Sequence, residues 1–193
     1  DFYSPQEGTI SIDGHPLESI KRSSLRSHMA FVLQDSFLFQ GNIMENIRYG
    51  RLEATDEEVI EAAKQANAHT FIMNMRGQYQ AELHQGGSGI SQGQKQLLSI
   101  ARTILANPTI LVLDEATSSI DTITEINIQE ALQRLMEGRT SLVIAHRLNT
   151  IRQADRIVVL HEGRVLEQGS HNDLLKRRGF YAELVLNQFT EHL

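Results

Sequence analysis

The sequence contains no cysteine and only three prolines in 193 residues. Without cysteine the chain has no disulfide, no thiolate metal site and no cysteine nucleophile, which fits a reducing compartment. No apolar run approaches the roughly 18 residues that a membrane-spanning helix needs, and no signal peptide is visible. We therefore expect any link to a membrane to come through a partner or through sequence outside these residues.

The composition is that of a globular protein. Hydrophobic residues make up 40% of the chain and charged residues 22%, which excludes a disordered polymer. A length of 193 residues suffices for one sizeable domain or for a domain with a subdomain. The net charge of −6 argues against a broad basic face, so we expect no nucleic-acid partner.

One short apolar run ends in two adjacent carboxylates. Residues 110–113 are all aliphatic and are followed by Asp114 and Glu115, a pattern that predicts a strand buried on both faces. Open α/β sheets hold their ligands at the carboxyl ends of their strands. One carboxylate there can hold a divalent metal, and the next can orient a water for phosphoanhydride hydrolysis. Taken alone, the segment also fits a strand that ends at the surface with solvated acids.

Strand-like and helix-like segments alternate along much of the chain. Apolar runs at residues 29–33 and 140–145 predict two more strands, and the alternation predicts a parallel α/β sheet. Between them the pattern turns helical. We expect a helical subdomain at residues 42–101, inserted into an α/β core made of residues 1–41 and 102–193. A hairpin around Gly163 and two short helices complete the expected elements.

Three Thr or Ser residues are each followed, three positions later, by Glu or Gln. This is the spacing of a capping box, in which side chain and backbone bond reciprocally at the start of a helix. The pairs are Thr55 with Glu58, Ser91 with Gln94, and Thr122 with Glu125. The sequence therefore predicts that a helix starts at each of these places.

The helix start at Ser91 has the character of an anion site. Backbone N–H groups at the positive end of a helix favour negatively charged ligands. Gly93 would let a phosphate approach the backbone, and Ser91 would add a hydroxyl donor. Taken alone, the segment equally fits an ordinary N-terminal cap that contains glycine.

Five motifs together, in this order and spacing, strongly resemble the nucleotide-binding domain of ATP-binding cassette (ABC) transporters. They are Gln34 at a strand end, residues 90–94, the pair Asp114 and Glu115, residues 118–121, and His146. The resemblance covers essentially the whole chain. It implies an α/β fold with the parallel sheet core of P-loop NTPases, incomplete here, and an inserted helical subdomain. It also implies an ATPase that uses Mg²⁺ with ATP as substrate.

The resemblance assigns catalytic roles to four residues. Asp114 is similar to the Walker B residue that holds the metal, and Glu115 to the general base. Gln34 is similar to the Q-loop glutamine, which contacts the metal and the attacking water. His146 is similar to the switch histidine, which contacts the γ-phosphate.

Other residues resemble those that act across a dimer. Residues 90–94 are similar to the signature motif, usually Leu-Ser-Gly-Gly-Gln, with Ile and Gln at its first and third positions here. The resemblance implies that Ser91, Gly93 and Gln94 contact ATP held by a second nucleotide-binding domain in a head-to-tail dimer. Ser119 and Asp121 are similar to D-loop residues that face the opposite subunit.

Residues 37–50 are similar to the exporter branch of the family. In that branch this region, and the loop before the signature motif, couple to a transmembrane domain. The loop commonly carries a glutamate where Gln85 stands here. The resemblance thus implies a transmembrane partner and a location on the cytoplasmic side of the cell membrane.

A P-loop is missing from the sequence. That motif, Gly-x-x-x-x-Gly-Lys-Ser/Thr, cradles the phosphates, and no glycine in this chain is followed by lysine. We expect a domain shortened at its N-terminus that binds ATP weakly or not at all by itself. We also expect the sheet to lack a central strand beside residues 110–113.

Three functions fit these observations. The first is the ATPase domain of an exporter, present as a fragment and inactive or very weak alone. The second is a non-hydrolysing interaction module that supplies a signature motif to a partner ATPase. The third is an ABC protein without a membrane partner, acting in translation or repair. The pair Asp114 and Glu115 favours the first over the second, and residues 37–50 disfavour the third.

Overall fold

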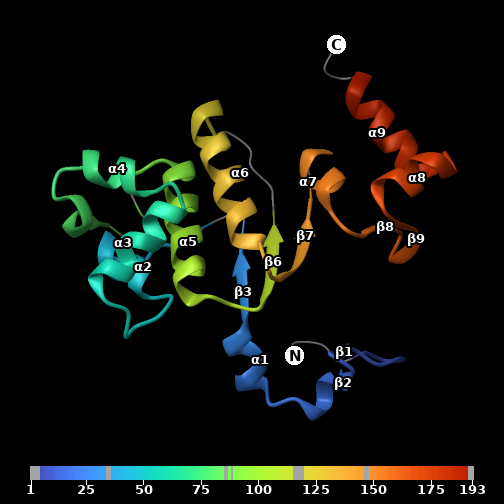
Figure 1. Ribbon diagram of the computed structural model, residues 1–193, viewed down its shortest axis with the longest axis horizontal. Helices are drawn as coiled ribbons and strands as arrows, with labels where there is room; N and C mark the ends of the chain where they lie inside the picture. Colours follow the sequence, from blue (N-terminus) through green and yellow to red (C-terminus); the bar gives the residue numbers. More distant parts are fainter. Residues whose placement is uncertain are drawn as a thin grey trace. The chain divides into compact units, whose positions relative to one another are not determined.

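The computed structural model describes residues 5–33, 36–84, 87, 89–114, 120–145 and 148–190. Two compact units make up the chain, Asp1–Val143 and Ile144–Leu193. Figure 1 labels their helices and strands. The first unit runs through β1 (Ser11–Ile12), β2 (His15–Pro16), η1 (Leu17–Ser19), α1 (Arg22–His28), β3 (Met29–Val32), β4 (Gly41–Asn42), α2 (Ile43–Arg48), α3 (Asp56–Gln65), α4 (His69–Asn74), η2 (Gln78–Gln80), β5 (Glu82–Leu83), α5 (Gln92–Ala106), β6 (Ile110–Asp114), α6 (Thr122–Met136) and all but the last residue of β7 (Thr140–Ile144).

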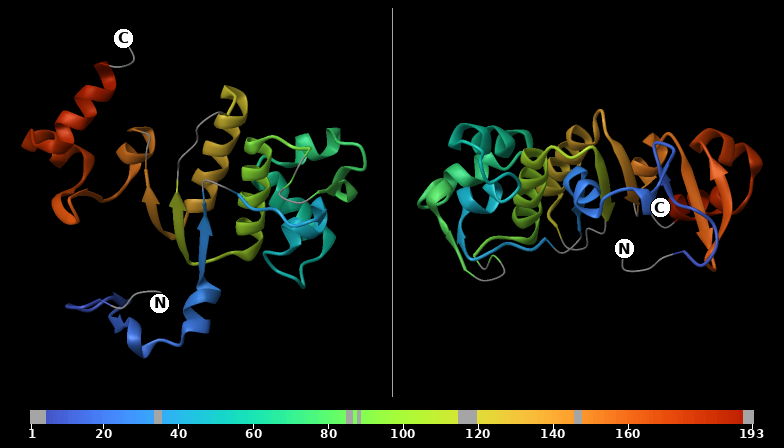
Figure 2. Two further views of the ribbon diagram at one scale, coloured as in Figure 1. Left: turned by 180° about the vertical axis from the view of Figure 1, so that it is seen from behind. Right: turned by 90° about the horizontal axis from the view of Figure 1, so that it is seen from below.

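The predicted α/β fold with a parallel sheet is confirmed. The main sheet has the strand order β3-β6-β7, and its three arrows point the same way (Figure 2). β3 and β6 are parallel, with Ala30 opposite Leu111 and Val32 opposite Leu113. Because successive side chains of a strand point to opposite faces, these four residues share one face. That face joins the core formed with α5 and α6, where Leu111 and Leu113 are buried.

Two expectations about β6 are wrong. β6 does not lack a neighbour, since it is hydrogen-bonded between β3 and β7. Nor is it buried on both faces, because Ile110 and Val112 are only half-buried. On the same face, Phe31 of β3 is 57% exposed, and Leu142 of β7 is 65% exposed. The described helices α5 and α6 thus protect one face of the sheet, while its other face leaves apolar side chains open to solvent.

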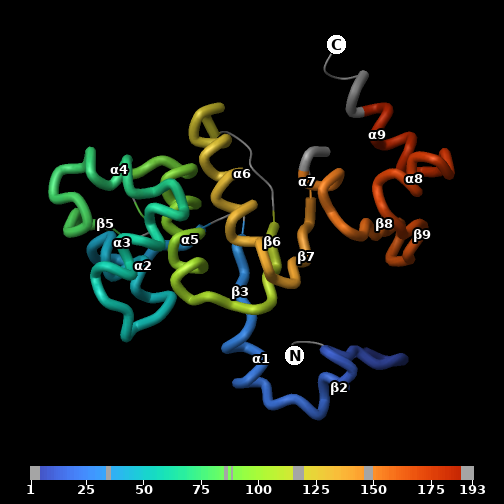
Figure 3. The backbone as a smooth tube through the Cα atoms, viewed as in Figure 1, coloured from blue at the N-terminus to red at the C-terminus, as the bar shows by residue number. Residues whose placement is uncertain are grey.

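Helices α2 to α5 form one group around a shared core (Figure 3). α5 is the longest of these four helices, and it contributes buried residues on most of its turns because its apolar residues recur at helical spacing. Two predicted capping boxes are confirmed, Thr55 with Glu58 at α3 and Ser91 with Gln94 at α5. The expected subdomain boundaries at residues 42 and 101 stay a prediction.

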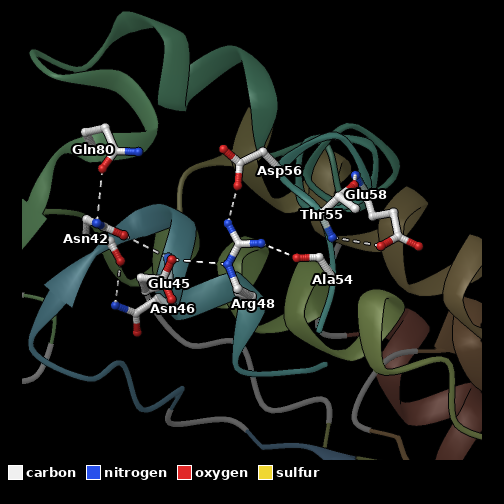
Figure 4. A network of polar contacts seen from close by, with 9 residues as sticks. All are labelled: Asn42, Glu45, Asn46, Arg48, Ala54, Thr55, Asp56, Glu58 and Gln80. Atoms are coloured by element: carbon white, nitrogen blue, oxygen red, sulfur yellow. Dashed lines mark hydrogen bonds and ion pairs between the residues drawn. The ribbon is translucent and has the colours of Figure 1, made fainter. Parts of the chain in front are cut away.

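A polar network fixes the connection between α2 and α3 (Figure 4). Arg48 donates to the Ala54 carbonyl oxygen and to the Asp56 carboxylate, and it pairs with Glu45 at 3.1 Å. The Asp56 contact raises the pKa of Arg48. The guanidinium therefore joins the end of α2 to the first turn of α3.

The cap of α6 differs from the prediction. α6 begins at Thr122, and its cap is Asp121, whose carboxylate accepts a hydrogen bond of 3.0 Å from the Thr124 backbone N–H. The predicted cap, Thr122, is the first helical residue instead. Asp is among the strongest capping residues, and its position one residue earlier places Thr124 at the right spacing.

The second unit has a small core of its own. It contains α7 (Leu148–Gln153), β8 (Ile157–His161), β9 (Arg164–Gly169), α8 (His171–Arg177) and α9 (Phe180–Thr190). The antiparallel pair β8-β9 confirms the predicted hairpin. The core of this unit includes the buried residues Leu174 and Tyr181, and the Tyr181 hydroxyl lies 2.7 Å from His171 Nδ1. Within the described ranges, no helix combines the length and the apolarity needed to cross a bilayer.

Candidate nucleotide site

The structure places Asp114 at the carboxyl end of β6. Asp114 is the last residue of this strand and is half-buried. Parallel strands end at one edge of a sheet, which is where such sheets hold ligands. Four predicted site residues lie outside the described residues, namely Gln34, Glu115, Ser119 and His146. In sequence, three of them follow β3, β6 and β7 closely.

Asp114 suits a Mg²⁺ ion that is shared with a nucleotide. Mg²⁺ in phosphate-transferring sites usually takes only one or two protein carboxylates, with waters and phosphate oxygens filling its other positions. The described residues contain no group of three or more His, Asp or Glu side chains that would form an all-protein cage. The Asp114 carboxylate at the end of β6 therefore fits a Mg²⁺ ion whose other positions are filled by phosphate oxygens and waters.

Ser91 closes the start of α5 by a reciprocal pair of hydrogen bonds. Its hydroxyl oxygen accepts from the Gln94 N–H at 3.2 Å, and the Gln94 side-chain oxygen accepts from the Ser91 N–H at 3.0 Å. Because the hydroxyl accepts in this pair, its own hydrogen remains available to donate to an anion. The capping box thus orients the Ser91 hydroxyl at the positive end of α5.

Gly93 lies where α5 presses against α6. A Cβ atom at this position would come within 2.4 Å of Thr124 Cγ2 and 3.1 Å of Ile120 Cγ2. Gly93 itself is buried. Packing therefore requires glycine here, a reason that the sequence did not reveal; the approach of a phosphate to this backbone stays a prediction.

Asp121 stands at the start of α6, next to the same contact. Hydrogen bonds from Thr124, first of all from its backbone N–H, hold the pKa of Asp121 below its usual value. The carboxylate is exposed and therefore ionised at neutral pH. Through Thr124, the structure brings together the predicted signature residue Gly93 and the predicted D-loop residue Asp121.

A second group of residues was missed by the sequence analysis. Arg102 of α5 lies 5.3 Å from the Phe39 ring centroid and 5.6 Å from that of Tyr49. Its guanidinium also donates to oxygens of Asn46 and Phe37. The one sequence signal was an arginine in the largely apolar second half of the helix, residues 97–106.

The chain is similar to known proteins of one family. A family model described as "ABC transporter" matches residues 1–118. The ABC transporter ATP-binding protein YfiC of Bacillus subtilis is 63% identical over 188 residues, which cover 97% of this chain and 31% of that protein. The ATP-dependent lipid A-core flippase of Syntrophus aciditrophicus is 50% identical over 98% of this chain and 32% of its own length.

A solved structure has the same fold. The structure of a bacterial Atm1-family ABC exporter with ATP bound matches with a TM-score of 0.87 and 46% identity, over 97% of this chain and 33% of that one. The chain thus spans about a third of the length of these relatives. Fold, family model and relatives agree that the chain belongs to the ABC transporter family and corresponds to the ATP-binding part of its exporters.

Proposed function

We propose that this chain is part of the domain that hydrolyses ATP to power an ABC exporter. The observation that carries the proposal is the junction of α5 and α6, where the capped start at Ser91 packs beside the Asp121 cap through Gly93 and Thr124. A helix start that can bind an anion, packed against the start of the helix that follows a strand ending in Asp114, is the arrangement expected of a phosphate site.

The acidic strand supplies the hydrolytic chemistry in this proposal. Asp114 would hold Mg²⁺ together with phosphate oxygens of ATP, and the ion would neutralise charge that develops on the phosphates. Glu115 would accept a proton from the attacking water. Gln34 would orient that water, and His146 would contact the γ-phosphate.

The helix start at Ser91 acts on a nucleotide that is held by a second copy or a sister domain. The phosphates of that nucleotide would lie between the partner's P-loop on one side and Ser91, Gly93 and Gln94 on the other. Ser119 and Asp121 would face the partner domain. The present sequence has no Gly-Lys pair and hence no P-loop of its own. The chain alone would therefore bind ATP weakly or not at all.

An aromatic surface is the proposed contact with the transmembrane part. Phe37 and Tyr49 are 61% and 57% exposed, and their ring centroids lie 5.2 Å and 4.5 Å from that of Phe39. Exposed aromatic side chains gathered in one place are typical of interaction surfaces. Through this partner the domain would lie on the cytoplasmic side of the membrane.

Titration calorimetry of this chain with Mg-ATP tests whether the chain can bind ATP without a P-loop. The proposal predicts no binding in the micromolar range, because the amides and the lysine of a P-loop are absent. Micromolar affinity for the chain alone would contradict it. Equimolar addition of a domain that carries its own P-loop should raise ATP affinity, and Ser91→Ala should cancel that gain.

The alternative is a non-hydrolysing module that only lends its helix start to a partner. The intact capping box at Ser91 fits this alternative as well. The two functions differ at Glu115. If the chain only supplies its helix start to a partner ATPase, Glu115→Gln leaves the partner's ATP turnover unchanged. If Glu115 is the base, the same substitution stops turnover at its site.

A further inference from the structure

Arg102 joins α5 to two segments that are far from it in sequence. Its Nε donates to the Asn46 carbonyl oxygen at 2.9 Å, and its Nη2 donates to Asn46 Oδ1 at 3.2 Å. Its Nη1 donates to the Phe37 carbonyl oxygen at 3.1 Å. One planar guanidinium thus holds α2 and the segment before it at fixed positions against α5.

Asn46 extends this connection into the aromatic segment. Asn46 is 4% exposed; its Oδ1 accepts from the Phe39 N–H at 2.9 Å, and its Nδ2 donates to the Phe39 carbonyl oxygen at 3.0 Å. Asn46 Oδ1 therefore accepts hydrogen bonds from both the Phe39 N–H and the Arg102 guanidinium. A buried amide whose bonds are satisfied in this way fixes a single backbone arrangement.

The ring faces of Phe39 and Tyr49 complete the cluster. Both rings lie within 6 Å of the Arg102 guanidinium, close enough for cation–π attraction. Burial lowers the pKa of Arg102, but arginine stays charged at any physiological pH. Gly50, which follows α2, packs against the backbone of α5 at Arg102. A Cβ atom on Gly50 would lie 2.1 Å from the Arg102 carbonyl oxygen, so no larger residue fits there.

α5 carries this cluster and the helix start at Ser91 on one element. It is an uninterrupted α-helix of 15 residues, Gln92–Ala106, and its residues Leu98 and Ala101 are fully buried. Helices packed in this way shift as rigid bodies instead of bending locally. An intact helix of this kind would carry a displacement applied near Arg102 to Ser91.

We propose that Arg102 is a positioning residue that ties the aromatic segment, residues 37–50, to α5, so that a displacement of this segment by the membrane partner moves Ser91 and Gly93. The inference rests on the proposed function, since it assigns the aromatic segment to the membrane contact. It adds the residue through which that contact reaches the helix start that closes on ATP.

The experiment uses Arg102→Gln and Arg102→Lys in the lipid-reconstituted transporter that carries this domain. Lysine keeps the charge but not the forked donor, so both variants should lower kcat for ATP at least about fivefold. Arg134→Gln is the matched control. Arg134 of α6 also donates to a carbonyl oxygen and a side-chain amide oxygen, those of Gln65 and Asn67, but it is remote from the aromatic segment in this network.

Amide hydrogen exchange in the same variants measures the link itself. Arg102→Gln should speed exchange at residues 37–41 and at residues 92–95 together, whereas Arg134→Gln should speed neither. Faster exchange at residues 37–41 alone would overturn the proposed link, as would a kcat loss no larger than that of Arg134→Gln. Full rescue by Arg102→Lys would also overturn it.

A separate variant tests the proposed function on which the inference depends. Phe37→Ala removes an exposed ring that makes no side-chain hydrogen bond, and it should lower coupled ATP hydrolysis. If its kcat stays at the level of the unchanged protein while Arg102→Gln loosens both segments, the membrane contact is misassigned and the link through Arg102 stands. If Phe37→Ala lowers kcat but Arg102→Gln leaves residues 92–95 unchanged, the contact stands and the link is overturned.

Discussion

Gly93 of α5 lies directly against Thr124 of α6, so that a Cβ on Gly93 would approach Thr124 Cγ2 to 2.4 Å. Contacts this short do not occur between real methyl groups, so one helix would have to shift. We expect Gly93→Ala to lower the free energy of unfolding by about 1–3 kcal/mol, the usual cost of overpacking. Urea unfolding followed by circular dichroism measures this change.

A second substitution isolates the contact. Thr124→Ser removes the Cγ2 methyl while it keeps the hydroxyl, so the double variant should recover most of the stability lost in Gly93→Ala. The next neighbour, Ile120 Cγ2 at 3.1 Å, can yield by a few tenths of an ångström. Additive losses in the double variant would show that Gly93 is needed for another reason.

The cap of α6 can be checked by substituting two adjacent residues. Asp121→Ala removes the acceptor of the Thr124 N–H and should cost about 1 kcal/mol of stability. Thr122→Ala should change stability by less than about 0.5 kcal/mol, because Thr122 is exposed and is not the cap. If thermal melts show that both variants lose the same stability, Asp121 is not the cap of α6.

Tyr79 makes stability depend on alkaline pH. Burial raises the pKa of Tyr79 from 10.0 to about 12, and its hydroxyl lies 2.9 Å from His69 Nδ1. As the pH rises, Tyr79 therefore ionises in the unfolded chain before it ionises in the folded one. The contribution of its neutral hydroxyl to the free energy of unfolding is complete below pH 10 and is lost as the pH rises toward 12. The loss is on the order of 2 kcal/mol.

Tyr79→Phe removes this dependence. The difference in free energy of unfolding between the unchanged protein and the variant should be constant at pH 7–9. It should then shift against the unchanged protein between about pH 10 and pH 12. A difference that stays constant over the whole range would mean that the Tyr79 hydroxyl is not desolvated in the fold.

The uncovered face of the sheet predicts self-association. Leu142 is 65% exposed on β7, so Leu142→Thr should leave the unfolding temperature within about 2 °C while it reduces concentration-dependent light scattering. Thr is β-branched and retains the strand preference of this position. An unchanged scattering curve would mean that another surface causes any association.

Local signals in the sequence predicted much of the fold. The capping boxes at Thr55 and Ser91 depend on residues three positions apart, so the sequence shows them directly. At α6 the same rule was wrong by one residue, because Asp121 and Thr122 are both suitable caps and only the backbone geometry separates them.

Features that depend on distant contacts were not predictable in the same way. Arg102 donates hydrogen bonds to Asn46 and Phe37, which lie 56 and 65 positions away in the sequence. No pattern in the sequence near Arg102 predicts these partners. The exposure of Phe31 and Leu142 likewise depends on which helices cover the sheet. For the same reason the apolar run at residues 110–113 predicted burial on both faces, although only one of them is covered.

ATP turnover by the transporter that carries this domain, measured with and without Glu115→Gln, tests the central claim most directly. If Glu115 is the base beside Asp114, the variant should lose at least about a hundredfold in kcat while it still retains bound Mg-ATP. Retention of nucleotide shows that the variant is folded. Unchanged hydrolysis in the variant would remove Glu115 from the reaction and contradict the assignment of the acidic strand.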